Sequence, residues 1–525
     1  MSGFKINANA LTSIGIAILG LLLAIYVGSA IGSSEATVVA LIIAVIPAFV
    51  TFVSLKQMIW VLIPIGWFLN SRVGLLPLPL SVQDLTIIAS MTGFALLVIM
   101  RQVPAKVGRR LLDNVVYLNV VYIVIVFIRH PAGFFLFQTE QVGGRAYVSV
   151  LLALGAYLVL SRAALTPFVA KIWPLLTLIP LFVSSMMAVA GKLYPSLAPT
   201  LTAIYGQSIS GVDQPVVIGE QRLAEVQTLG TTIVLALVSV YPPLSLLNPI
   251  NLGRAILLFS GLAFIFLSGF RLAIMAAVVF FALSLILRQQ IVGLWILATS
   301  LVMIFVAVIA VQISGLVELP FTVQRTLSFL PGDWDPDAKR DAEESTQWRL
   351  EMWRWAWEDD RILRDKIWGQ GVGLSLGDMQ IEAAARTSGR GEGSGFTGGA
   401  MQEWWLINGA FHNGPLSAIR NVGAFGLLLY LALILTTVRV AWRLCLQAQG
   451  TYLFNMALFI TIPILWESLR FVFLYGHYPA AICTSIYWAG LLNLLRNNMP
   501  EKAPPEAQTC NLKQALRPPP ITFAS

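Results

Sequence analysis

The chain has 525 residues, of which 57% are hydrophobic and only 11% are charged. Soluble domains carry about 25% charged residues, so this composition excludes an ordinary soluble protein and indicates an integral membrane protein. The net charge of +8 is uneven, with −6 between Ile313 and Asn413 and +14 over the rest of the chain. A nucleic-acid-binding protein would gather its basic charge in a soluble patch, so nucleic acid is excluded as a partner.

Apolar runs of roughly 17 to 25 residues recur along the chain, as helices that cross a lipid bilayer require. We therefore expect an all-α polytopic membrane protein with about 12–14 transmembrane helices, whose partner is the lipid bilayer. The first run lacks a small-residue cleavage site, which predicts a retained helix and not a signal peptide. The predicted helices, of which the third is short, are 11–32, 36–55, 57–70, 84–100, 114–129, 146–161, 167–190, 229–247, 253–270, 272–288, 291–312, 414–437, 452–474 and 478–496.

Basic residues in the short loops predict the orientation of the chain. An even number of predicted helices separates the loops that carry most of these residues, so the loops lie on the same side of the membrane. They contain Lys56, Arg101, Arg162 and Arg288. Placing these loops in the cytoplasm satisfies the positive-inside rule and puts both termini there as well. The single large loop is then external, in the periplasm if the cell is Gram-negative, and we expect the protein in the bacterial inner membrane.

These expectations divide the chain into four parts. Residues 1–312 form the N-terminal transmembrane helices, 313–413 a large periplasmic loop with an amphipathic helix, 414–496 the C-terminal transmembrane helices and 497–525 a cytoplasmic tail. The tail is rich in proline and has little to bury, which predicts disorder.

Two stretches of the large loop have distinct characters. Residues 329–340 are rich in proline and aspartate and predict turns. From about Ser345 to Trp368 the sequence is helical in character, and Trp353 and Trp357 share one face. A tryptophan-rich amphipathic helix suits a membrane surface, but the same side chains could instead pack the loop onto the helix bundle. Both interpretations are open at this point.

His412, one of three histidines, lies where the polar loop returns to apolar sequence. A polar side chain at such a boundary is costly unless it has a partner or a function. Asn413 follows, and after nine further residues come Gly423 and Gly426, whose spacing predicts close helix packing. Imidazole titrates near neutrality and could take a proton from an acceptor hydroxyl, which makes His412 the candidate catalytic residue. The alternative is a histidine that only caps a helix.

Arginines supply the second part of a candidate site. Arg271 has apolar sequence on both sides, which is costly unless the guanidinium meets water or an anion. Arg349 opens the loop helix, and Arg222 and Arg145 lie at other predicted external ends. Guanidinium groups bind phosphate through two parallel hydrogen bonds, so such residues suit a diphosphate. We expect this role for Arg271 and Arg349, interpret Arg145 as an interfacial anchor that reaches lipid headgroups, and leave both roles open for Arg222.

Other polar residues have simpler interpretations. Glu467 and Arg470 stand three residues apart in an apolar helix, which predicts an intrahelical ion pair. His130 and His477 border helices without a pattern around them, and we assign them no function. Histidines, cysteines and carboxylates do not fall at metal-ligand spacing, so we expect neither a metal nor another cofactor.

The order of these features resembles that of the O-antigen ligase and O-antigen polymerase superfamily of bacterial envelope glycosyltransferases. The resemblance covers roughly Arg222 to Tyr430 and is most specific at the histidine motif. Ligases often continue this motif with threonines, whereas Leu427 and Leu428 follow it here. The matching residues are Ser268, Arg271, Arg349, Trp353, Gly369, Gly371, His412, Asn413, Gly423 and Gly426.

The resemblance implies an inverting, metal-independent transfer of a glycan from an undecaprenyl-diphosphate carrier to a lipid or glycan hydroxyl on the external face. In that scheme Arg271 and Arg349, with Arg222 as a further candidate, hold the diphosphate, and His412 activates the acceptor hydroxyl. An O-antigen ligase-like enzyme is the first interpretation. The alternatives are a polymerase that joins repeat units of O-antigen or exopolysaccharide, and a transporter of an anionic or lipid-linked solute.

Overall fold

The computed structural model describes residues 56–69, 81–103, 110–131, 143–197, 223–373 and 409–500, apart from residues 247, 315–318 and 361. Helices account for all the regular secondary structure in these ranges, which confirms the all-α polytopic membrane fold. Seven of the described helices are long and apolar enough to cross a membrane, and five shorter apolar helices accompany them. The predicted helices 11–32 and 36–55, and the tail beyond residue 500, lie outside the described residues.

The described helices follow the predicted order along the chain. They are η1 (Lys56–Val61), α3 (Leu62–Leu69), α4 (Val82–Ile99), α5 (Leu111–Arg129), α6 (Arg145–Leu160), α7 (Pro167–Leu193), η2 (Pro195–Leu197), α9 (Ala224–Val240), α10 (Pro243–Leu246), η3 (Pro249–Asn251), α11 (Leu252–Leu267), α12 (Arg271–Leu287), α13 (Ile291–Ser314), α14 (Phe321–Leu327), α15 (Pro336–Glu358), α18 (Gly414–Ala448), α19 (Phe454–Leu469), the π-helical turn η4 (Arg470–Leu474) and α20 (Tyr478–Asn497).

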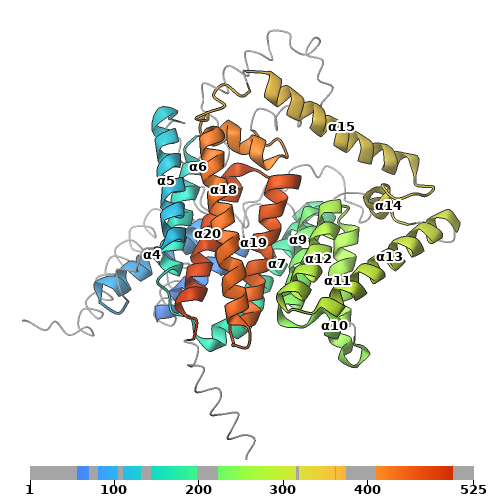
Figure 1. Ribbon diagram of the computed structural model, residues 1–525, viewed down its shortest axis with the longest axis horizontal. Helices are drawn as coiled ribbons and strands as arrows, with labels where there is room; N and C mark the ends of the chain where they lie inside the picture. Colours follow the sequence, from blue (N-terminus) through green and yellow to red (C-terminus); the bar gives the residue numbers. More distant parts are fainter. Residues whose placement is uncertain are drawn as a thin grey trace, which may run out of the picture.

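The C-terminal helices α18, α19 and α20 form the centre of the bundle. Helices α4, α5 and α6 lie on one side of them, and α9, α11 and α12 lie on the other (Figure 1). Small residues permit close contact at the centre, since a Cβ atom on Gly490 of α20 would lie 3.0 Å from the Cα atom of Tyr157 of α6. By contrast α13 leads away from the bundle, and none of its most apolar window is buried.

Buried polar groups between the central helices pair with one another. The Tyr157 hydroxyl donates to the Asp113 carboxylate, and the Asn493 amide donates to Asp113 Oδ1 at 2.9 Å and to Ser161 Oγ at 3.2 Å. A polar side chain between membrane helices is stable when a neighbouring helix satisfies its hydrogen bonds. This network therefore joins α5, α6 and α20.

The prediction that Arg145 is an interfacial anchor was wrong. Its side chain is only 7% exposed and forms an ion pair with the equally buried carboxylate of Asp84 in α4. Asp84 also accepts a hydrogen bond of 2.8 Å from the backbone N–H of Ser81, which fixes the carboxylate at the start of its helix. A buried cation requires such a partner, and here it is supplied by a residue 61 positions earlier in the chain.

The bounds of the loop helix also differ from the prediction. Helix α15 starts at Pro336, inside the stretch expected to form turns, and ends at Glu358, ten residues before the expected end. Asp335 explains the start, because its Oδ1 accepts hydrogen bonds from the N–H groups of Asp337 at 2.8 Å and Ala338 at 3.0 Å. An aspartate N-cap followed by proline in the first turn is a strong signal for the start of a helix.

Candidate functional site

His412 occupies the turn that leads into α18. Its φ of 52° lies in the left-handed region, which costs a residue other than glycine about 1–3 kcal/mol. Asn413 is the N-cap of the helix, since its Oδ1 accepts a hydrogen bond of 3.0 Å from the N–H of Leu416. The capping role therefore belongs to Asn413, and the imidazole of His412 is directed by a strained turn just outside the helix.

The imidazole lies between two aromatic rings. Its centroid is 5.4 Å from that of Trp348, which meets it edge-on at 85°, and 5.0 Å from that of Tyr475. The guanidinium carbon of Arg349 is 5.7 Å from the Trp348 indole centroid, and that of Arg470 is 5.6 Å from the Tyr475 phenol centroid. Arg470 forms the predicted ion pair with Glu467, which is thereby confirmed. We call these residues the His412 row: Arg349, Trp348, His412, Tyr475, Arg470 and Glu467.

Two glycines bring Tyr475 to this position. A Cβ atom on Gly476 would lie 2.8 Å from the Cα atom of Gly414, so the segment after η4 and the start of α18 touch backbone to backbone. The N–H of Tyr478 also donates to Ser417 Oγ at 3.1 Å. The segment that carries Tyr475 and His477 is thus fixed against the turn of His412.

The surroundings of His412 favour the neutral imidazole. Burial, followed by the positive charges of Arg349 and His477, lowers the pKa of His412 to about 4. Burial also lowers the pKa of His477 to about 4, with a further contribution from the charge of Arg420. A neutral ring at pH 7 has a nitrogen lone pair that can accept a proton.

The tryptophan-rich helix α15 packs onto the segment that carries His412. Met352 and Ala356 are completely buried against Phe411 in a small core separate from that of the bundle. The indole N–H of Trp353 donates to the Phe411 carbonyl at 2.6 Å. Trp348 and Trp353 thus pack the loop helix onto the segment that carries His412, one of the two predicted roles of these tryptophans. Trp357 does not, since it is 52% exposed.

Gly423 breaks α18 and does not serve a close contact between helices, which corrects the prediction for this glycine. Its φ of 72° and ψ of 176° are not helical, and a side chain would collide with the carbonyl of Ile367. The break leaves backbone groups without helical partners, and the loop segment 366–371 pairs with them. Ala424 N–H donates to the Lys366 carbonyl at 2.8 Å, and the N–H groups of Gln370 and Gly371 donate to the carbonyls of Arg420 at 2.9 Å and Asn421 at 3.0 Å.

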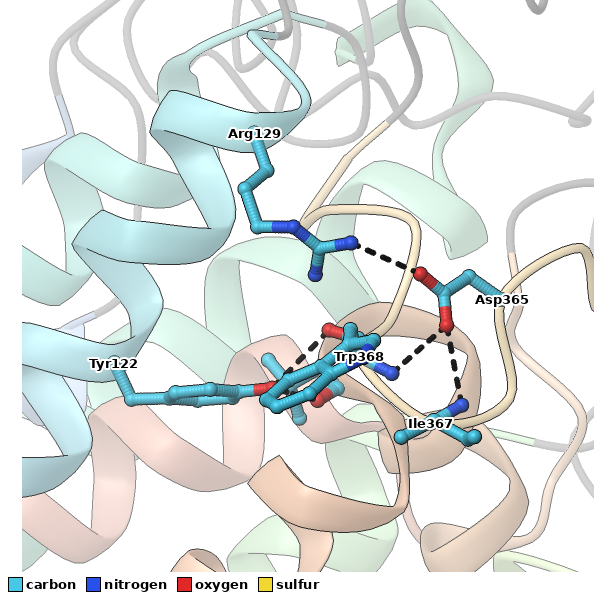
Figure 2. A network of polar contacts seen from close by, with 6 residues as sticks. Tyr122, Arg129, Asp365, Ile367 and Trp368 are labelled. Atoms are coloured by element: carbon cyan, nitrogen blue, oxygen red, sulfur yellow. Dashed lines mark hydrogen bonds and ion pairs between the residues drawn. The ribbon is translucent and has the colours of Figure 1, made fainter.

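Helix α5 holds this loop segment in place (Figure 2). The Asp365 carboxylate accepts hydrogen bonds from the N–H groups of Ile367 at 3.2 Å and Trp368 at 2.8 Å, and it pairs with Arg129 at 3.1 Å. The Tyr122 hydroxyl lies 3.2 Å from the Trp368 carbonyl oxygen and 3.0 Å from that of Val422. One hydroxyl thus bridges the loop and the last turn before the break.

Gly426 confirms the predicted close helix packing. A Cβ atom at this position would lie 2.7 Å from the Tyr122 ring of α5. Tyr122 therefore touches α18 on both sides of the break, with its hydroxyl at Val422 and its ring at Gly426. The two glycines of the motif have different functions in the fold, one to interrupt the helix and one to admit an aromatic ring.

Arg271, the second predicted diphosphate ligand, contacts the end of α14. Arg271 begins α12, and its Nε and Nη2 donate to the Arg325 carbonyl at 3.3 and 2.9 Å, with a further hydrogen bond of 3.2 Å from Nη2 to Ser328 Oγ. These contacts cap the end of α14. Arg222 lies outside the described residues.

Arg420 is a buried cation that the sequence analysis missed. It is only 6% exposed and lies beneath Gly409, where a Cβ atom would be 2.5 Å from Arg420 Cδ. Its charge acts on His477, which in turn acts on His412. The signal was present, because Arg420 falls inside a predicted membrane helix, where a charge is costly unless it has a function.

Within the part of the chain that the structure describes, no group of three or more His, Cys, Asp or Glu side chains could hold a metal ion. No protein-family model and no curated protein matches this chain. The functional interpretation therefore depends on the residues of the site.

Proposed function

We propose that the protein is an integral inner-membrane glycosyltransferase that moves a glycan from an undecaprenyl-diphosphate carrier to a hydroxyl acceptor at the periplasmic face, in the manner of an O-antigen ligase. The observation that carries the proposal is the His412 row. It combines a largely buried imidazole, whose lowered pKa favours the neutral form, with two guanidinium groups that each lie against one of the aromatic rings next to it. These are the two kinds of group that the reaction needs, a base for the acceptor and cations for the leaving diphosphate.

His412 is the base in this scheme. The acceptor oxygen attacks the anomeric carbon as its proton passes to the imidazole, the bond from that carbon to the diphosphate oxygen breaks, and the lipid diphosphate leaves. A pKa of about 4 makes the free imidazole a weak base, partly because of the charge of Arg349. A bound diphosphate would offset that charge and raise the pKa, so the base becomes stronger when the donor is present. General-base catalysis contributes roughly 10²–10⁴-fold to a rate.

Arg349 is the first candidate for the diphosphate. The buried contacts of Met352 and Ala356 fix the helix that carries Arg349, and the guanidinium lies against the Trp348 ring of the same helix. A cation held in place near a leaving group stabilises the growing charge without reorganisation during the reaction. Arg271, at the start of α12, is the second candidate, and Arg222 remains part of the proposal as a third.

The proposal is tested by reconstitution of the purified protein in liposomes with an undecaprenyl-diphosphate glycan and candidate acceptors, without ATP and with EDTA. We expect glycan transfer and release of the lipid diphosphate. A single transfer to a lipid acceptor indicates a ligase, and a ladder of repeat units indicates a polymerase. Movement of the carrier across the bilayer without a new bond would support the transporter and contradict the proposal.

Two variants separate the role of His412 from general damage. His412→Ala should abolish transfer, whereas the protein should keep its elution profile and its thermal transition. The matched control is His130→Ala, because His130 is exposed at the end of α5. Transfer at the wild-type rate in His412→Ala would remove the catalytic assignment.

A further inference from the structure

A cavity of about 310 Å³ lies between α3, α9, α12, α19 and α20. It reaches from Arg470, at the end of α19, about three helical turns into the bundle as far as Phe459. It also follows the first turns of α9 and α12, where Gln227 and Leu272 line it. Its volume is at the lower end of the roughly 300–1,000 Å³ typical of ligand sites, which suits a ligand of about one or two sugar rings.

The lining is apolar in part, and its polar part carries no net charge. Gln227, Thr231 and Thr484 contribute an amide and hydroxyl groups, and Glu467 and Arg470 contribute an ion pair. An acyl chain would desolvate these groups without replacing their hydrogen bonds, which is unfavourable. An anion would be attracted by Arg470 but repelled by Glu467. The lining therefore fits a neutral ligand with many hydrogen-bonding groups.

Aromatic rings supply the apolar part of the lining. Trp67, Trp466 and Trp488 all face the cavity, and neighbouring rings hold them in place. The Trp67 ring stacks on Tyr487 with centroids 4.1 Å apart and planes 7° apart. A sugar ring has C–H groups on its faces and hydroxyls around its edge, so indole faces next to hydrogen-bonding groups are a suitable environment for it.

Two buried donors at the cavity lack acceptors within the described part of the chain. They are the indole N–H of Trp488, whose side chain is only 8% exposed, and the Nε–H of Arg470. Buried donors are almost always hydrogen-bonded in native structures, so each such group requires an explanation. A hydroxylated ligand would supply the acceptors.

Tyr475 links the cavity to the candidate active site. Its ring lies 5.6 Å from the guanidinium carbon of Arg470, which lines the cavity, and 5.0 Å from the imidazole of His412. A ligand that reached Arg470 would thus be linked to the candidate base through that guanidinium and the Tyr475 ring. Arg470 opens a π-helical turn, and such turns occur frequently at functional sites.

We propose that this cavity binds a neutral sugar residue of the glycan substrate, next to the group on which His412 acts. The inference rests on the proposed function for the identity of the substrate, but sugar binding itself requires no transfer. The sugar could belong to the donor glycan or to a glycan acceptor, which share this chemistry.

Binding is measured by saturation-transfer NMR on the full-length protein in nanodiscs, with the methyl glycosides of glucose, galactose, mannose and N-acetylglucosamine as probes. We expect at least one of them to bind. Thr231→Val and Thr484→Val keep the side-chain shape but remove a hydroxyl, and each should weaken binding by roughly threefold to tenfold, as expected for one hydrogen bond. The matched control is Thr299→Val, because Thr299 is exposed on α13, outside the cavity.

The inference is overturned if none of the four glycosides binds, or if both cavity variants bind them as the wild type does. Displacement of a bound glycoside by inorganic pyrophosphate would also overturn it, because the cavity would then be an anion site. Sugar binding in a protein that transfers no glycan would contradict only the proposed function, whereas transfer unaffected by Thr231→Val and Thr484→Val would contradict only this inference. In a transferring protein, a raised KM for donor or for acceptor identifies which of the two supplies the sugar.

Discussion

Gly369 and Gly423 meet backbone to backbone, although they belong to the large loop and to a membrane helix. A Cβ atom on Gly369 would lie 2.5 Å from the backbone nitrogen of Gly423. Both residues have positive φ, 84° and 72°, and so each needs a conformation that glycine adopts readily. The contact joins the loop before α18 to the break within that helix, which lies ten residues after the N-cap Asn413.

The first prediction concerns this contact. Gly369→Ala and Gly423→Ala should each lower the free energy of unfolding by at least about 1–3 kcal/mol, the cost of backbone strain alone, with a further penalty from the collision. Apparent Tm values in detergent, together with glycan transfer, measure the effect. The control is Gly253→Ala, since Gly253 is helical in α11 and a Cβ atom there has nothing within 4 Å. An unchanged Tm in Gly423→Ala would show that α18 does not need its break.

The hydrogen bonds of Tyr147 and Tyr122 predict which of two phenylalanine variants is less stable. The Tyr147 hydroxyl accepts a hydrogen bond of 2.8 Å from the buried N–H of Val372, so Tyr147→Phe leaves a donor unsatisfied and should cost about 1–3 kcal/mol. Tyr122→Phe removes a donor that serves only carbonyl oxygens and should cost about 0.5–1.5 kcal/mol. Apparent Tm values should thus fall further in Tyr147→Phe, and the reverse order would contradict the assigned directions of these bonds.

Asp365 predicts a dependence of stability on pH. Burial alone would raise the pKa of its carboxyl, but hydrogen bonds from Trp368, Arg129 and Ile367 hold the pKa below its ordinary value. Its contribution to stability is therefore complete above the ordinary aspartate pKa of about 3.9 and is lost as the pH falls through the lowered value. The Tm difference between the wild type and Asp365→Asn should shrink at low pH.

Arg129→Gln should lower the free energy of unfolding by no more than about 1 kcal/mol, because the ion pair of Arg129 with Asp365 is partly exposed.

His412 predicts the acid limb of the pH–rate profile. Because the pKa of the free imidazole is about 4, kcat/KM should fall only as the pH approaches that value. Arg349→Gln removes one of the neighbouring cations and should move the acid limb to higher pH, in addition to any change in KM. An acid limb at the same pH in both proteins would mean that another group controls it.

The lowered pKa of His412 also implies that the free energy of unfolding declines as the pH falls from about 6.5 to 4, where the unfolded chain binds the proton more readily.

Arg271 predicts two separable effects. Arg271→Ala removes the hydrogen bonds to Arg325 and Ser328 and should reduce stability by about 1–3 kcal/mol, as expected for a charged donor. If the guanidinium also binds the diphosphate, donor affinity should fall further in Arg271→Ala than in Arg271→Lys, which keeps a charge. Ser328→Ala is the control, because it removes the hydroxyl that Arg271 Nη2 contacts, keeps the guanidinium and its bonds to the Arg325 carbonyl, and should leave donor affinity unchanged. Equal donor affinities in the two Arg271 variants would argue against the diphosphate contact.

Much of the fold could be predicted from local patterns. The order and approximate limits of the described membrane helices follow from runs of apolar residues, since each helix must satisfy its own backbone in the bilayer. The pairing of Glu467 with Arg470 follows from the spacing of three residues on one helix. The position of His412 at the boundary of the loop follows from the same change in polarity.

Contacts between distant segments were decided only by the tertiary structure. Arg145 is buried because Asp84 of another helix neutralises it, which no local pattern indicates. Gly423 interrupts its helix because the loop around Gly369 supplies the missing hydrogen bonds. His412 owes its place in the row to Trp348, before it in the chain, and Tyr475, after it, and its lowered pKa to burial and to the charges of Arg349 and His477. Hydropathy acts on each segment by itself, whereas the partner of a charge or a ring depends on how the segments pack.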